Sequence, residues 1–293
     1  ASQHPYRQWV EGNSVEMSEL PKREHVNHSG QSVQRRQRAF GYTEEDLKLL
    51  LAPMANTGKE PLGSMGNDAP MAALSNRSRM LFDYFTQKFA QVTNPPLDWE
   101  REKIVTCLES AIGPEPNLLA DSELHAKKIL IPLPVLNSDE MAQLKRLDRA
   151  KLLGGYYKPF IVKGLYQVAG GGKALKERLN EIFEEIDKAI ENGSNFLVLS
   201  DRDSNYAWGP IPSLLLTSAV QHHLLRRHTR TQISMVVEAG DVREIHHVAL
   251  LIAYGAAAVN PYLAFESVED LARKGYLKVD AETAVKNLTG ALS

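Results

Sequence analysis

Two short apolar segments, residues 195–201 (NFLVLSD) and 233–239 (ISMVVEA), most constrain how this chain folds. Each is rich in Val, Leu or Ile, contains an acidic residue at or near its carboxyl end, and precedes a helical pattern. Apolar runs of this length that alternate with helices are typical of parallel strands buried on both faces. The two segments therefore predict adjacent strands of one parallel sheet.

Function in parallel α/β sheets concentrates at the carboxyl ends of the strands. Ser200, Asp201 and Arg202 end the first segment, and Glu238 and Gly240 end the second. Two interpretations of Asp201, Arg202 and Glu238 remain open. An Arg–carboxylate pair could hold neighbouring loops together, which spacing alone favours. The same groups could instead bind a substrate anion in an independent barrel-like enzyme or anion-binding domain.

The pattern predicts an α/β fold with a partial or irregular TIM-barrel-like parallel layer of about five strands. Residues 1–40 are expected to form an extended entry arm, residues 41–126 a helical and looped cover, and residues 127–293 the β/α region. Residues 41–293 are expected to form one domain. Further predicted elements are helices at 43–56, 78–89, 96–112 and 173–190, and a strand at 128–133.

Composition excludes several classes of protein. The formal net charge of −2 argues against binding to nucleic acid, and the basic run at residues 35–38 is read as a solvated face or as ion-pair partners. No apolar run approaches the length of a membrane helix. The single cysteine, Cys107, allows no disulfide and no cysteine metal cluster, and it is expected to pack as a small apolar side chain. A cytoplasmic location is expected.

Motifs for common catalytic sites are incomplete. The stretch AGGGK (169–173) lacks the first Gly and the final Ser or Thr of a phosphate-binding loop. The pairs His222-His223 and His246-His247 are adjacent on helices, so neither directs two ligands at one metal. Packed or capping histidines are expected instead. A loop rich in Gly and Pro at residues 58–70 fits either a ligand or tunnel loop or a long surface connection.

Several blocks in one order resemble the central domain of the large subunit of bacterial-type glutamate synthase, from about Pro5 to the end of the chain. They are FGYTEED (40–46), TGKEPLGSMG (57–66), FAQVTNPP (89–96), LVLSDR (197–202), PIPSL (210–214), VEAGDVREIHH (237–247) and YGAAAVNP (254–261). The resemblance implies a parent oxidoreductase that makes two glutamates from glutamine, 2-oxoglutarate and reductant. The electron donor, whether NADPH, NADH or ferredoxin, stays open.

The resemblance also implies partners and cofactors outside this chain. A glutamine amidotransferase domain and an FMN synthase domain of the parent chain are the expected partners, and a small reductase subunit is a further candidate. FMN and a 3Fe-4S cluster belong to the parent, and no cofactor, metal or catalytic residue is expected in this fragment. The fragment alone is expected not to be catalytic.

The family's central domain joins the two active sites and contributes to the wall of an ammonia tunnel. The resemblance implies that role for two matching blocks. The tunnel or interdomain residues expected there are Gly63, Ser64, Met65, Gly66, Asn67, Asp68, Gln91, Thr93 and Asn94.

Overall fold

The structure is a computed structural model that describes residues 4–26, 28–61, 70, 73–76, 78–86, 97–117, 119–150 and 152–293. The strands are β1 (Ser14–Glu16), β2 (Ser110–Ile112), β3 (Lys128–Ile131), β4 (Pro159–Lys163), β5 (Leu165–Gln167), β6 (Phe196–Ser200), β7 (Trp208–Pro210), β8 (Ser234–Glu238) and β9 (Ala258–Asn260). The helices are α1 (Tyr6–Asn13), α2 (Gly30–Ala39), α3 (Ala52–Thr57), α4 (Trp99–Val105), α5 (Ser138–Leu144), α6 (Leu147–Ala150), α7 (Gly171–Glu191), α8 (Ser213–Arg226), α9 (Ile245–Ala253), α10 (Tyr262–Arg273) and α11 (Ala281–Leu292).

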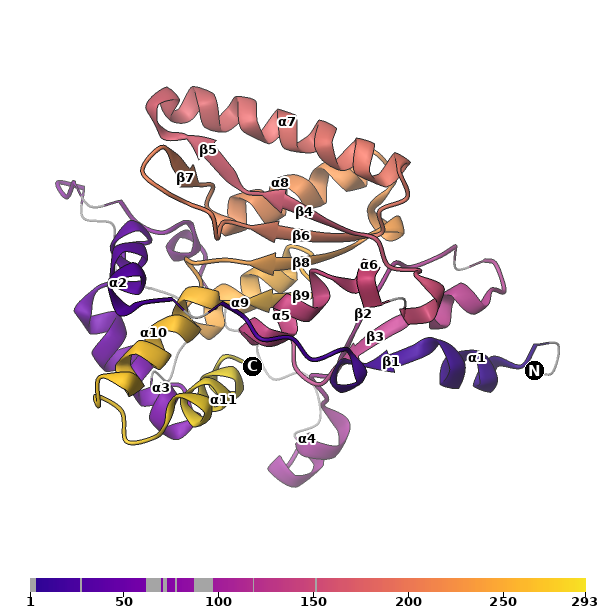
Figure 1. Cartoon of the computed structure of the whole chain (residues 1–293), viewed down its shortest axis with the longest axis horizontal. Helices are drawn as coiled ribbons and strands as arrows, with labels where there is room; N and C mark the ends of the chain where they lie inside the picture. The colour runs from indigo at the N-terminus through magenta and orange to yellow at the C-terminus, as the bar shows by residue number, and fades with distance from the viewer. Residues whose placement is uncertain are drawn as a thin grey trace.

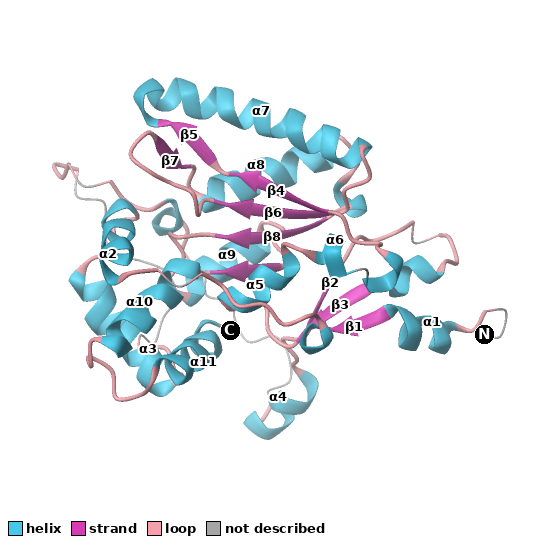
Figure 2. Ribbon diagram, in the orientation of Figure 1, coloured by secondary structure: helices cyan, strands magenta, loops and turns pink. Residues whose placement is uncertain are grey.

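A four-stranded parallel sheet in the order β4-β6-β8-β9 forms the centre of the chain (Figure 2). β4 pairs with β6, β6 with β8, and β8 with β9. Along the chain, α7, α8 and α9 lie between the members of these three pairs, in that order. This sequential order is that of a barrel wall. A parallel bridge from Val135 to Val259 extends the layer beyond β9. The predicted α/β fold with a partial barrel-like parallel layer is confirmed.

Both faces of the sheet are buried, which explains the uninterrupted apolar runs. Alternate residues such as Leu197 and Leu199 pack with α8, α9 and α7 in the largest apolar cluster. Phe196 and Val198 point to the other face, where they pack in a cluster with Met141 of α5 and with residues of the β1-β3-β2 sheet. Figure 1 shows that small sheet at one end of the molecule and α2, α3, α10 and α11 together at the other.

Several predicted elements differ from the structure. Residues 1–40 are not simply extended, because they contain α1, β1 and α2. The segment 128–133 forms β3, which pairs with β1 and β2 and not with the central sheet. The predicted helix at 96–112 is shorter, because α4 ends at Val105 and β2 begins at Ser110. Cys107 follows α4 and is exposed rather than packed.

The aromatic segment 78–89 is also not a full helix. Among its described residues, 78–86, a 3-10 turn covers Leu81–Tyr84, and Phe82 in that turn is buried. The Phe82 ring stacks on the His247 ring at 4.2 Å, so a tertiary contact sets the local conformation. Among the described residues, no helix is both long and apolar enough to cross a bilayer.

Truncation of a leucine should lower the free energy of unfolding more in the central sheet than on the surface of the molecule. Leu197→Ala removes a fully buried side chain from the middle of β6 and should lower the free energy of unfolding by about 2–5 kcal/mol. Leu225→Ala on α8 changes a half-exposed side chain and should cost less than about 1 kcal/mol. Urea unfolding of the two variants measures the difference. Equal losses would contradict the assignment of β6 to the centre of the core.

Candidate functional site

The strand register brings the predicted site residues to one edge of the sheet. Ser200 at the end of β6 pairs with Glu238 at the end of β8, and Glu238 pairs with Asn260 at the end of β9. Arg202 follows β6 by two residues. The carboxyl ends of β6 and β8 point toward the side of the molecule where α2 and α10 lie (Figure 2). The edge therefore faces α2 and α10.

Glu238 is the centre of a buried ion network. It is 2% exposed, and its Oε1 accepts a hydrogen bond from Nε of Arg202 at 2.9 Å. Its Oε2 accepts hydrogen bonds from Nζ of Lys145 and Oγ of Ser200. Burial alone would raise the pKa of Glu238, but the charges of Lys145 and Arg202 outweigh burial and lower it. Glu238 is therefore held as a carboxylate.

Arg202 extends the network to a second buried carboxylate, on α10. Its Nη1 donates to Oε1 of Glu266 at 2.9 Å, and Glu266 is also 2% exposed. Nη1 of Arg36 on α2 lies 2.7 Å from the other oxygen of Glu266. The guanidinium of Arg202 lies 4.3 Å from the ring centre of Tyr262. Three cations thus surround two carboxylates, and they connect the sheet to α10 and α2.

The third predicted residue, Asp201, points elsewhere. Its carboxylate accepts from the backbone N–H of Gly240 at 3.0 and 3.1 Å, in a buried site. Burial, with the nearby charge of Asp241, raises the pKa of Asp201. A side chain at Gly240 would meet the Phe40 ring at 2.6 Å, so a larger residue there would have to displace that ring. The structure therefore brings Arg202 and Glu238 together and separates Asp201 from them.

Local sequence explains how the partners reach this edge. Asn137 caps α5 in a capping box with Glu140, and Lys145 follows the end of that short helix. Ser29 caps α2, which carries Arg36. Arg36, Lys145 and Glu266 were not predicted as site residues. Glu266 could have been found as a charged residue within the apolar run that opens α10.

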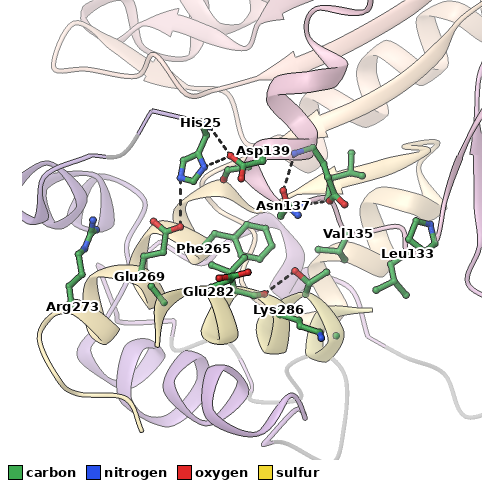
Figure 3. A pocket seen from close by; sticks show the side chains of 18 residues that line it. His25, Leu133, Val135, Asn137, Asp139, Phe265, Glu269, Arg273, Glu282 and Lys286 are labelled. Atoms are coloured by element: carbon green, nitrogen blue, oxygen red, sulfur yellow. Dashed lines mark hydrogen bonds and ion pairs between the residues drawn. The ribbon is translucent and has the colours of Figure 1, made fainter. Parts of the chain in front are cut away.

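A pocket of about 750 Å³ lies between the 132–140 segment, α10 and α11 (Figure 3). His25 stands at its edge, where its Nδ1 lies 2.8 Å from Asp139 and its Nε2 lies 3.6 Å from Glu269. The backbone N–H of His25 also donates to Asp139. Glu269 and Asp139 raise the pKa of His25 to about 9, against the opposing effect of burial. This His25 clasp fastens the segment before α2 to α5 and α10.

The other candidates from the sequence are the paired histidines and the glycine-rich stretch, and their contacts are those of structural residues. His246 lies within 3.2 Å of the Phe82 carbonyl oxygen, and His247 is buried. Burial, with the charge of Arg243, lowers the pKa of His247 well below its usual value. The ring of His223 stacks on Phe183. Within the described ranges, no group of three His, Cys, Asp or Glu side chains could hold a metal. The glycines at 170–172 lie at the start of α7.

The predicted tunnel residues lie outside the described residues. This applies to Gly63, Ser64, Met65, Gly66, Asn67, Asp68, Gln91, Thr93 and Asn94.

Removing the central carboxylate should destabilise the fold strongly. Glu238→Gln removes the counter-charge of Lys145 and one of the two carboxylates that Arg202 binds, and should lower the free energy of unfolding at pH 7 by about 3–5 kcal/mol. Glu184→Gln changes an exposed glutamate on α7 and should cost less than about 0.5 kcal/mol. Chemical denaturation of both variants tests this expectation.

The pH dependence of the same variant provides a second readout. Because the pKa of Glu238 is lower in the folded chain than in the unfolded chain, its pairing stabilises the fold above the unfolded pKa. That contribution is lost as the pH falls through the folded pKa. The difference in stability between the parent chain and Glu238→Gln should therefore shrink in acid. A difference that stays constant down to the acid limit would refute the assignment.

The His25 clasp predicts the opposite pH dependence, because its contribution to stability is lost in base and not in acid. The folded pKa of about 9 lies above the usual value of 6.5, so the clasp contributes fully below pH 6.5 and is lost as the pH rises through 9. The contribution reaches up to about 3 kcal/mol. His25→Gln should remove it, and the stability difference from the parent chain should vanish near pH 10. Stability curves of equal shape for the two proteins would rule out the clasp.

Comparison with known proteins agrees with the sequence blocks. A family model described as the glutamate synthase central domain matches residues 35–293. The glutamate synthase [NADPH] large chain of Bacillus subtilis is 42% identical over 97% of this chain, which spans 18% of that relative. Glutamate synthase [NADH] of Schizosaccharomyces pombe is 42% identical over 87% of this chain and 12% of its own length.

Ferredoxin-dependent glutamate synthase 2 of Synechocystis is 36% identical over 98% of this chain and 19% of its own length. Among solved structures, a mutant of flavocytochrome b2 with benzoylformate is similar over 54% of this chain and 48% of that chain. It shares 17% identity at a TM-score of 0.33, a level at which the likeness carries no argument. On the match across residues 35–293 and on these relatives, the chain belongs to the glutamate synthase central domain family.

Proposed function

We infer that this chain links a glutamine amidotransferase domain to an FMN synthase domain in a glutamate synthase, and that it helps form an ammonia tunnel between them. The observation that carries this proposal is the family match over residues 35–293, in a chain that spans only 12% to 19% of its relatives' length. The reaction of the parent would convert glutamine, 2-oxoglutarate and reductant into two glutamates, as part of glutamate biosynthesis.

The chemistry of the described site supports a structural part in that reaction. Arg202 and Glu238 bind each other, and Asp201 is buried against the backbone of Gly240. A general acid or base needs a group within reach of substrate, and here the carboxylates already accept hydrogen bonds from the protein. The alternative of an independent enzyme that uses these three residues therefore has less support.

Exposed apolar side chains fit the expectation of neighbouring domains. Ile104 and Val105 on α4 are 83% and 62% exposed, and α4 projects from the body of the molecule (Figure 1). Exposed apolar groups of this kind are often covered by a partner surface. The proposed partners are the amidotransferase and synthase domains. FMN and the 3Fe-4S cluster are proposed to lie in the synthase domain, since one exposed cysteine cannot ligate such a cluster.

The names of the relatives include NADPH, NADH and ferredoxin, and a relative of each kind is 42% identical to this chain. Similarity to this chain therefore does not follow the electron donor. We propose no donor for the parent, and a small reductase subunit stays a candidate partner.

The tunnel proposal rests on the sequence blocks at residues 57–66 and 89–96 and is tested by bulky substitutions. Ser64→Trp or Thr93→Trp, made in the full-length glutamate synthase, should narrow the path for ammonia. Glutamine-dependent glutamate synthesis should fall by about tenfold, whereas synthesis from added ammonia should stay near the parent rate. Steady-state assays with either nitrogen source measure both rates.

A matched control is Thr231→Trp, since Thr231 is exposed and lies in the turn before β8, apart from the proposed blocks. It should leave both rates unchanged. If Ser64→Trp and Thr93→Trp reduced the two rates equally, the tunnel proposal would fail.

A further inference from the structure

A second pocket, of about 1,170 Å³, opens over the carboxyl ends of β6 and β8. Arg202 and Glu238 line it, together with residues of α2, the end of α5 and the loop at 202–206. Its volume is sufficient for a small organic molecule. The proposed linking function does not use this pocket.

The lining of this pocket is strongly basic. Six Arg and Lys side chains line it together with three carboxylates, and the carboxylates are Glu24, Asp203 and Glu238. The cations are Arg23, Arg35, Arg36, Lys145, Arg146 and Arg202. The whole chain has a formal net charge of −2, so positive charge is concentrated here against the overall balance. A concave site lined by one sign of charge raises the local concentration of counter-ions.

The carboxylates near the pocket neutralise only part of this charge. Glu238 and Glu266 offset two of the three inner cations, Arg36, Lys145 and Arg202. Asp203 pairs with Lys163, which does not line the pocket. In the part of the chain that the structure describes, Arg23, Arg35 and Arg146 form no ion pair. These three exposed arginines form the outer ring of the pocket.

The inner cations are held in position and still have free donors. Arg202 uses Nε and Nη1 for Glu238 and Glu266, and among the described residues its Nη2 has no hydrogen-bond partner. Its side chain is 20% exposed, and that of Lys145 is 21% exposed. Cations fixed by buried partners lose little conformational freedom when they bind an anion, and charge-assisted hydrogen bonds are the strong ones.

We propose that this pocket is a binding site for a small organic anion with at least two negative charges, carried by carboxylate or phosphate groups. Arg202 and Lys145 contact the anion at the base of the pocket, and Arg35 and Arg146 contact it at the mouth. This proposal does not depend on the tunnel or on the linking function.

Calorimetric titration of the chain with succinate and, separately, with inorganic phosphate tests the proposal. One saturable site is expected. The double variant Arg35→Glu/Arg146→Glu should weaken binding by about tenfold or more, because each change removes a charge-assisted contact. Both arginines are exposed, so the fold should persist, and thermal unfolding verifies this. Saturable binding of succinate alone assigns a carboxylate ligand, and saturable binding of phosphate alone assigns a phosphorylated one.

Arg38→Glu is the matched control. Arg38 is exposed on the same helix as Arg35 but does not line the pocket. It should leave the affinity unchanged. If neither probe bound at millimolar concentration, or if Arg38→Glu weakened binding as much as the double variant, the proposed site would be overturned.

Discussion

The fold depends on the need to pair two carboxylates that are buried at the carboxyl edge of the sheet. Glu238 and Glu266 are each 2% exposed, and an unpaired buried carboxylate costs several kcal/mol. The guanidinium of Arg202 pairs with both carboxylates. Lys145 also pairs with Glu238, and Arg36 also pairs with Glu266. The groups come from five separate parts of the chain. One electrostatic requirement therefore fixes α2, α10 and the end of α5 against the strand ends.

This arrangement gives the strand ends a different use from that in barrel enzymes, whose active sites lie at the same edge. The carboxylates here are committed to arginine and lysine, so they are poorly suited to accept a proton from a substrate. The network contains three cations and two carboxylates, so one positive charge is not balanced within it. This charge and the arginines around the pocket mouth are suited to bind an anion. We propose that the edge is a rigid joint with an anion site.

The sequence predicted the structure best for the strands that are buried on both faces. Residues 196–200 and 234–238 are apolar because the sheet is covered on both faces, so an unbroken run predicts a strand without further information. The convergence of Ser200, Arg202 and Glu238 followed from the rule that parallel strands end at one edge. The family blocks, which the family model confirms over residues 35–293, supplied what physical reasoning could not.

Other features depend on contacts between distant parts of the chain. Only Val33 and Gln37 of α2 are buried, so its sequence has no apolar stripe that would predict a helix. The partners Arg36 and Glu266 lie near opposite ends of the chain, and no local pattern joins them. Phe82 sits in a single turn because its ring stacks on His247. Asp201 follows β6 directly, but its carboxylate accepts a hydrogen bond from the N–H of Gly240 and points away from Arg202.

The most direct measurement of this account is a double-mutant cycle on Arg36→Gln and Glu266→Gln, with the free energy of unfolding as readout. If the ion network fastens α2 to the sheet, Arg36→Gln leaves the buried Glu266 with Arg202 as its remaining arginine partner, and Glu266→Gln leaves Arg36 without its carboxylate. The double variant removes both members of the pair, so its cost should be smaller than the sum of the single costs. The account predicts a coupling energy of about 1–3 kcal/mol between the two sites. Additive effects within about 0.3 kcal/mol would show that the pair is incidental, and would contradict a fold organised around this network.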